Sequence, residues 1–180
     1  MAWGENWEGE TDVPAGNDFV AVDGGWAYSV ALKQDGSLIA WGGGLHGTLN
    51  VPAGNDYVAI SAADYTGLAL KEDGSVAGWG WITRPPPGNN VVSVAAGSRF
   101  GLLLKQDGSL GAWGDRYFAY EPLPEGNRFV AIACGREHSL AIEVPEPSTA
   151  VSLLGIAAGC TLLVWRRKRG RSDFNRRRSQ

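Results

Sequence analysis

Cysteine, histidine and methionine are all scarce in this chain of 180 residues, which contains two cysteines, two histidines and one methionine. Two cysteines, Cys134 and Cys160, cannot make a disulfide-rich scaffold. Because Cys160 lies in an apolar run near the C-terminus, we expect no bond between them. No Cys-x-x-Cys pair occurs, and His46 and His138 lie far apart in the sequence. The sequence therefore predicts no zinc site and no other bound metal.

Charge is also low, at 19% of the residues, and the formal net charge is only −3. A globally basic nucleic-acid-binding domain is therefore disfavoured, and we expect no nucleic acid as a partner. What the chain has instead is 26 glycines and eight tryptophans. Glycine is a poor residue for helix interiors, so a helical bundle is disfavoured too. Many glycines among β-forming residues predict short strands joined by tight turns.

Signals for catalysis are missing as well. The glycine run 42–44 lacks the Lys-Ser/Thr of a phosphate-binding loop. His138 is the best isolated candidate for acid–base chemistry. It occupies a repeat position whose other members are Tyr28, Thr66 and Phe100, which favours a packing role. We therefore predict no catalytic residue and no cofactor.

An internal repeat dominates the first 143 residues. Asp-Gly-Ser occurs at 35–37, 73–75 and 107–109, and Trp-Gly begins six residues after each Asp. The period is 38 residues, with one unit shortened to 34 in the connector between Trp79 and Gly88. We expect each Asp-Gly-Ser to form a hairpin turn between two strands, with its glycine at positive φ. The residues predicted to have structural roles in the repeat are Gly36, Gly74, Gly108, Trp41, Trp79, Trp113 and an unpaired Trp3.

The repeat resembles that of the regulator of chromosome condensation family of β-propellers. Residues 20–42 carry the match, which recurs at 58–80 and 92–114, and its first half recurs at 130–142. The resemblance implies an all-β, propeller-type domain over 1–143, with three full units of about 38 residues and partial units. The partial units are complementary. If Ala2-Trp3 pairs beside 139–142 they would close a four-blade ring, and otherwise the units form an open arc.

The composition changes after Glu143. A linker at 144–149 leads to an apolar run at 150–165, and a basic tail follows at 166–180. The run is at the short end of a membrane span, and the alternative is a buried core helix with a solvated tail. Its anchoring residues would be Leu153, Leu154, Ile156, Leu162, Leu163, Val164 and Trp165. The positive-inside rule places the tail in the cytoplasm. The residues of this topology signal are Arg166, Arg167, Lys168, Arg169 and Arg171.

The order Val144-Pro145-Glu146-Pro147, apolar run and basic tail resembles a PEP-CTERM sorting signal. The resemblance implies a bacterial envelope protein that is recognised at this motif by exosortase, a membrane protease or transpeptidase. It also implies contact with membrane lipid until the protein is processed. The first residues of the chain contain no basic and apolar leader, so we expect a misassigned start or a fragment.

We therefore expect a non-enzymatic envelope protein whose repeats serve as a binding or structural module. A protein or carbohydrate ligand is expected on one propeller face, with contacts from Tyr57, Trp81, Tyr117 and Tyr120 near the connectors. Two alternatives remain open at this stage. One is a propeller-fold surface hydrolase or lyase, and the other is a chromatin or small-GTPase regulator by analogy with the named family.

The net charge of −3 conceals two unlike regions. Residues 1–165 carry 8 basic and 18 acidic side chains, a net charge of −10. Residues 166–180 carry 8 basic and 1 acidic side chain, a net charge of +7. This asymmetry fits an anchored tail better than it fits a single soluble domain.

Overall fold

A computed structural model describes residues 1–82, 84–115 and 122–145 of the chain. The chain divides into two compact units, Met1–Glu146 and Pro147–Gln180. The predicted apolar helix, the basic tail, Glu146 and Pro147 all lie outside the described residues. Within the part of the chain that is described, no helix is long and apolar enough to cross a membrane.

The described elements are strands apart from one turn of 3-10 helix, η1, at Leu45–Gly47, so the all-β prediction is confirmed. The strands are β1 (Phe19–Gly24), β2 (Tyr28–Lys33), β3 (Leu38–Gly42), β4 (Tyr57–Ala63), β5 (Thr66–Lys71), β6 (Val76–Gly80), β7 (Val91–Ala96), β8 (Phe100–Lys105), β9 (Leu110–Gly114), β10 (Phe129–Cys134) and β11 (Ser139–Glu143).

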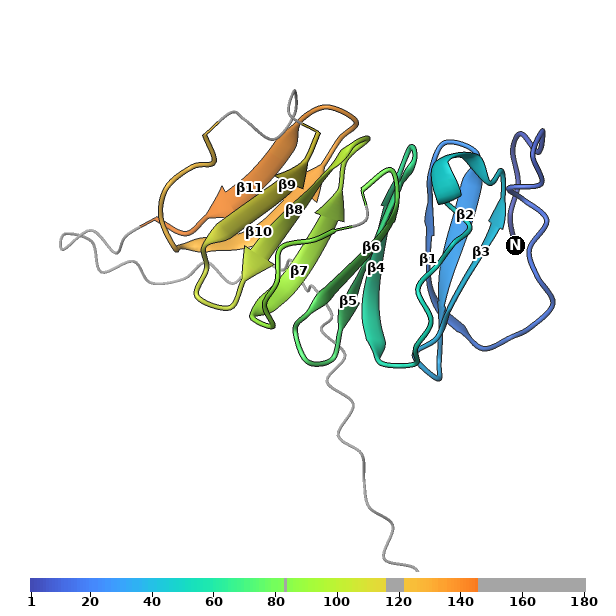
Figure 1. The fold of residues 1–180 in the computed structure, drawn as a ribbon, viewed down its shortest axis with the longest axis horizontal. Helices are drawn as coiled ribbons and strands as arrows, with labels where there is room; N and C mark the ends of the chain where they lie inside the picture. Colours follow the sequence, from blue (N-terminus) through green and yellow to red (C-terminus); the bar gives the residue numbers. More distant parts are fainter. Residues whose placement is uncertain (83, 116–121, 146–180) are drawn as a thin grey trace, which may run out of the picture. The chain divides into compact units, whose positions relative to one another are not determined.

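The strands form four small antiparallel sheets that follow the sequence repeat. Three sheets have three strands, in the orders β1-β2-β3, β4-β5-β6 and β7-β8-β9, and the fourth pairs β10 with β11 (Figure 1). The first strand of every sheet carries its bulge at the same repeat position, between Phe19 and Ala21 in β1 and between Phe129 and Ala131 in β10. The sequence units are therefore structural units, and we call each sheet a blade.

The core lies between successive blades. Val30 and Leu32 on one face of the first blade are buried, and Ile60 and Ala69 of the second blade pack in the same cluster. The strand alternation places these side chains on facing surfaces, because residues two apart share a face. Each fully buried aliphatic side chain is worth about 1.5–3 kcal/mol. We call the face that carries Val30 the forward face of a blade, and the opposite face that carries Ile60 the rear face.

The hairpin glycines work as predicted and also hold the blades together. Gly36, Gly74 and Gly108 have φ between +80° and +84°. A methyl group on Gly74 would collide with the carbonyl of Asn89 in the next blade. The Gly74 carbonyl accepts a 3.1 Å hydrogen bond from the Val91 amide of that blade. The turn thus needs glycine both for its conformation and for the close approach.

The repeated tryptophans differ in one respect. The Trp79 indole covers Gly67 of its own blade, and its Nε1 donates a 2.9 Å hydrogen bond to the Thr48 carbonyl. Trp113 covers Gly101 in the same way, but its buried Nε1 has no hydrogen-bond partner. Thr48 lies 31 residues before Trp79, and the same offset from Trp113 falls in the shortened connector. The four-residue deletion therefore accounts for the missing acceptor.

Of the two arrangements left open by the sequence, the described residues do not form the ring closed by Ala2-Trp3. Among the described residues, β11 pairs only with β10, and Trp3 lies outside every strand with its side chain 86% exposed. The physical reason is that the segment before β1 binds the first blade. The Glu10 carbonyl accepts hydrogen bonds from Ser29 Oγ at 2.8 Å and from Trp41 Nε1 at 2.9 Å. Trp3 therefore does not take the structural role that the three later tryptophans have.

Candidate functional site

The sorting motif begins at a definable point of the fourth blade. In the complete blades, the residue after the second strand donates its amide to the residue before the first strand, with Gln34 N to Asp18 O at 2.7 Å and Glu72 N to Asp56 O at 2.8 Å. Val144 N donates to Arg128 O at 3.0 Å in the same repeat position. Val144 thus makes the same backbone hydrogen bond as its equivalents in the complete blades, and the exposed Pro145 follows.

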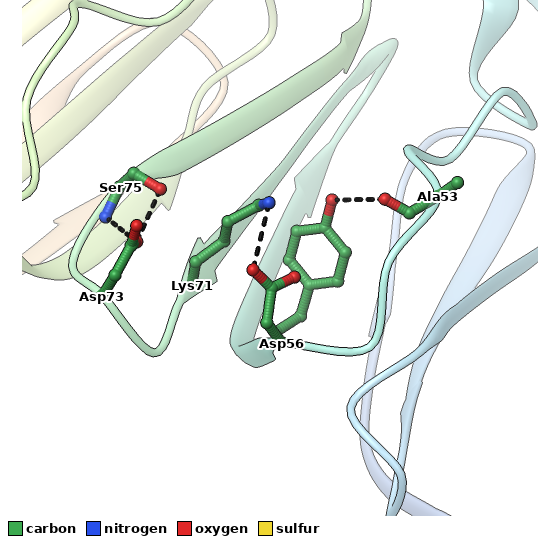
Figure 2. Close-up of polar contacts among 6 residues, drawn as sticks. Ala53, Asp56, Lys71, Asp73 and Ser75 are labelled. Carbon is green, nitrogen blue, oxygen red and sulfur yellow. Dashed lines mark hydrogen bonds and ion pairs between the residues drawn. The ribbon is translucent and has the colours of Figure 1, made fainter.

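An ion pair lies beside this backbone hydrogen bond in three blades. In the fourth blade the acidic and the basic residue have exchanged positions. Lys33 pairs with Asp18 at 3.8 Å, and Lys71 pairs with Asp56 at 3.1 Å (Figure 2). At the corresponding positions of the fourth blade, Arg128 pairs with Glu143 at 2.7 Å. Both arrangements are part-exposed, so each contributes modestly to stability. Attraction between the two strand ends is nevertheless kept in spite of the exchange of charges.

The hairpin chemistry is lost at the fourth blade. Asp73 Oδ1 accepts hydrogen bonds from Ser75 N at 2.8 Å and from Ser75 Oγ at 2.6 Å (Figure 2). These bonds hold the pKa of Asp73 below its ordinary value, and Asp35 and Asp107 repeat the arrangement. At the corresponding positions, Pro145 replaces the aspartate and Pro147 replaces the serine. Proline supplies neither the carboxylate nor the donating N–H, so the sorting motif stands where a complete blade has its turn.

A second candidate site is a cluster of aromatic side chains on the connectors. His46 lies 4.8 Å from Tyr65 and 4.4 Å from Trp81, centroid to centroid, and Trp26 lies 5.6 Å from Tyr65. The Arg99 guanidinium lies 4.5 Å over the Trp81 ring. We call these four aromatic residues the aromatic ridge. Aromatic rings with polar edges are typical of recognition surfaces.

A hollow of about 480 Å³ adjoins the ridge at Trp26 and is lined by the ends of β1, β4, β7 and β10. Its two carboxylates are already engaged. Asp23 accepts hydrogen bonds from the backbone amide of Gly24 and from that of Ala62 in the next blade. Asp64 Oδ2 binds Ser98 Oγ at 2.8 Å and Arg136 Nε at 2.9 Å. Asp23, Ser98 and Arg136 thereby link blades to one another, which is a structural use of these groups.

The titratable groups near the hollow are not tuned as nucleophiles. Burial raises the pKa of the Cys134 thiol, so the reactive thiolate is disfavoured. Burial also raises the pKa of Tyr28, together with the charges of Asp23 and Asp64. The Tyr28 hydroxyl donates a 2.7 Å hydrogen bond to the Thr66 carbonyl of the next blade. Among the residues described, no group of three or more His, Cys, Asp or Glu side chains could hold a metal ion.

Of the four aromatic residues expected at the binding face, Trp81 is exposed and belongs to the ridge. The prediction for Tyr57 is wrong, since its side chain is only 4% exposed and packs in the core between the first two blades. Tyr117 and Tyr120 lie outside the described residues. Sequence reasoning missed Trp26 and Tyr65, because they come from different connectors and no sequence spacing joins them.

The comparisons with known proteins concern both the sorting motif and the repeat domain. Residues 143–169 match the model described as the PEP-CTERM protein-sorting motif, so the predicted motif is confirmed. The ectodomain of the receptor kinase CR4 from Physcomitrella patens has a similar structure, with a TM-score of 0.67, 24% identity, and coverage of 77% of this chain and 42% of that chain.

Prp20p from Saccharomyces cerevisiae, a protein of the RCC1 type, matches with a TM-score of 0.63 and 16% identity, over 80% of this chain and 52% of that chain. The ectodomain of ACR4 from Arabidopsis thaliana matches with a TM-score of 0.59 and 21% identity, over 69% of this chain and 46% of that chain. This chain thus spans about half the length of the solved structures. A comparison with curated protein sequences finds no match. The fold is therefore that of RCC1-type propeller repeats, followed by a PEP-CTERM motif.

Proposed function

We propose that this chain is a bacterial envelope protein whose repeats form a non-enzymatic binding module and whose C-terminus is processed by an exosortase. The observation that carries the proposal is the sorting motif at 143–169, which starts at the last strand of the repeat domain. In this proposal the apolar run at 150–165 holds the chain in the membrane. The basic tail stays in the cytoplasm, and the repeats lie outside.

The geometry at Val144 supports this assignment. The Val144–Arg128 backbone bond and the Arg128–Glu143 ion pair fasten the end of β11 to the start of β10. Two prolines around Glu146 disfavour helix and remove two backbone donors. An enzyme in the membrane can therefore bind this segment as an extended chain without opening the blade.

The binding role is supported by the aromatic ridge, which brings Trp26, His46 and Trp81 together from three connectors. Aromatic rings of this kind suit a protein surface or a carbohydrate ring. The hydrolase alternative finds less support, because Asp23 and Asp64 are bound to neighbouring blades. Prp20p has binding properties toward Gsp1p and histones. A chromatin role of that kind fits poorly with a sorting motif in this chain.

The test is to replace Pro145, Glu146 and Pro147 by alanine together and to express the full-length gene in its native host. We expect the wild type to be shortened at its C-terminus and the variant to keep its basic tail, as measured by intact-protein mass spectrometry of the membrane fraction. The matched control is Pro122→Ala with Pro124→Ala, which alters another exposed Pro-x-Pro sequence in the connector before β10. Identical processing of the wild type and the triple variant would refute the sorting assignment.

The binding assignment needs its own test. Trp26→Ala and Trp81→Ala should each reduce retention of the full chain on isolated native envelopes, whereas Val58→Ala, an exposed residue away from the ridge, should leave retention unchanged. Equal retention of all three variants would exclude the ridge as the binding surface.

A further inference from the structure

A basic side chain of this chain already lies on the aromatic ridge. The Arg99 guanidinium lies 4.5 Å over the Trp81 ring, and its Nη1 lies 3.7 Å from Asp115 Oδ2. The negative face of an aromatic ring attracts a cation, and a carboxylate beside the ring adds to that attraction. One end of the ridge thus binds a cation with an indole and a carboxylate together.

The other end of the ridge has the same two groups without a cation. Trp26 is 64% exposed, and Trp26 and Asp23 both line the hollow of about 480 Å³. Among the described residues, no cation lies over the Trp26 ring and none pairs with Asp23. Asp23 accepts two backbone amide hydrogen bonds, which do not neutralise its carboxylate. An exposed indole and an uncompensated carboxylate therefore meet at this hollow.

The remaining charged groups of the hollow compensate each other. Arg136 Nε lies 2.9 Å from Asp64 Oδ2, so this pair adds no net charge beside Trp26. The position of Trp26 is fixed by the second blade, because Trp26 N donates a 3.1 Å hydrogen bond to the Asp64 carbonyl and the ring packs edge-on against Tyr65. The site is thus built by contacts between the first two blades.

The backbone around the ridge is held in an unfavourable conformation. His46 and Asp64 have φ of +56° and +29°, and they are the two non-glycine residues with positive φ in the part of the chain that the structure describes. A Cβ atom disfavours positive φ, and residues held there cluster at ligand-binding surfaces. His46 belongs to the ridge, and the Asp64 carbonyl is the acceptor for Trp26 N. This placement supports a binding role for the ridge.

The charge of the first two blades favours a basic partner. Residues 1–82 carry 2 basic and 11 acidic side chains, a net charge of −9, whereas residues 83–145 carry 6 basic and 6 acidic side chains. Both lysines of the first region already pair with aspartates. Complementary charge steers association and selects the partner. A cationic ligand therefore fits this region, whereas a neutral carbohydrate would gain nothing from its charge.

We infer that an arginine or lysine side chain of a basic polypeptide binds over Trp26 and beside Asp23. The arrangement repeats that of Arg99 over Trp81. The inference rests on the proposed binding role of the ridge and gives its partner a chemical class. A polypeptide is the occupant because the cation at the other end of the ridge is itself an amino-acid side chain. A guanidinium stacks on an indole and bonds a carboxylate at the same time, so arginine suits the site best.

The test is the binding of a fluorescein-labelled peptide, in which five arginines alternate with glycine, to the full chain in mild detergent, measured by fluorescence anisotropy. We expect the peptide to bind the wild type at about 0.15 M salt, at which exposed charges more than about 8 Å apart are screened. The same peptide with citrulline in place of arginine keeps the shape without the charge. It should bind about tenfold more weakly.

Variants of the chain locate the site. Trp26→Ala should weaken binding of the arginine peptide about fivefold, because the indole face is lost. Asp23→Asn keeps a hydrogen-bond acceptor and removes the charge, so it should weaken binding of the arginine peptide and leave the citrulline peptide unaffected. An unchanged melting temperature shows that this variant is folded. Trp7→Ala is the matched control, since Trp7 is 85% exposed, stands between Glu5 and Glu8 in the sequence, and lies outside the ridge.

Equal binding of the arginine peptide by Trp26→Ala and by the wild type would overturn the inference, since the acidic surface alone would then account for binding. Equal binding of the arginine and citrulline peptides would overturn it as well. Binding of dextran, a neutral polysaccharide, that needs Trp26 while the arginine peptide does not bind would replace it by a carbohydrate site. Loss of envelope retention in Trp26→Ala without any peptide binding would leave the proposed binding role standing and refute only the basic partner.

Discussion

The turn of a complete blade and the corresponding segment of the fourth blade differ in four consecutive residues. Glu72-Asp73-Gly74-Ser75 closes a hairpin in the second blade, and Val144-Pro145-Glu146-Pro147 takes the same repeat positions at the end of the domain. Both segments have the backbone hydrogen bond from the first of these residues and an ion pair beside it. The fourth blade is therefore held by the same kinds of contact as a complete blade up to Val144, where the sorting motif begins.

The largest effect on stability is expected at the hairpin glycine. Gly74→Ala should lower the free energy of unfolding by about 3 kcal/mol, because it combines a strained positive φ with a collision against the next blade. Urea unfolding of the full chain in detergent, followed by tryptophan fluorescence, measures it. Gly24→Ala is the control, since a methyl group there meets no atom within 4 Å. Equal effects would contradict the role of Gly74 in joining blades.

A smaller difference should separate the repeated tryptophans of the second and third blades, Trp79 and Trp113. Trp79→Phe removes the hydrogen bond to Thr48 and leaves its carbonyl without that donor, whereas Trp113→Phe removes an N–H that has no partner. We expect Trp79→Phe to be the more destabilising by about 1–2 kcal/mol in the same unfolding assay. Both substitutions remove a similar volume over a glycine, so each controls the other. A larger loss for Trp113→Phe would refute the effect assigned to the shortened connector.

The Arg128–Glu143 ion pair, which lies just before the sorting motif, should contribute less to the free energy of unfolding. Arg128→Asp places two carboxylates side by side and should cost about 0.5–1 kcal/mol, since the pair is part-exposed. Adding Glu143→Lys to Arg128→Asp recreates the arrangement of Asp56 and Lys71 and should restore the loss. A double-mutant cycle from urea unfolding measures the coupling. Failure of the second substitution to rescue the first would show that the Arg128–Glu143 pair is not equivalent to the Asp56–Lys71 pair.

Acid should weaken the three complete hairpin turns. Hydrogen bonds from Ser37, Ser75 and Ser109 depress the pKa values of the three turn aspartates in the folded chain. Unfolded aspartate titrates at about pH 3.9, so the unfolded chain binds more protons just below that value. The stabilisation is present above this pH and is lost as the pH falls through the folded pKa values. Replacing the three aspartates by asparagine should flatten this part of the stability–pH curve, and an unchanged curve would contradict the assignment.

Much of the fold could be predicted from the sequence, because its signals are local. The Asp-Gly-Ser turns, the alternating apolar residues and the 38-residue period fix strands and units without knowledge of distant contacts. The burial of Tyr57 was also readable, since Phe19, Val91 and Phe129 occupy its repeat position. The position of Trp3 could not be predicted, because it depends on where Glu10 binds the first blade. The aromatic ridge depends likewise on which connectors the topology brings together.

The most direct test replaces the sorting motif by the residues of a complete hairpin turn. The variant V144Q/P145D/E146G/P147S gives the fourth blade the residues of a complete turn and keeps the apolar run and the basic tail. Intact-protein mass spectrometry of membranes from the native host should then find the C-terminus unprocessed, with the free energy of unfolding equal to or above that of the wild type. Processing at the wild-type level in this variant would contradict the claim that the residues in the place of the hairpin, Val144-Pro145-Glu146-Pro147, are the sorting motif.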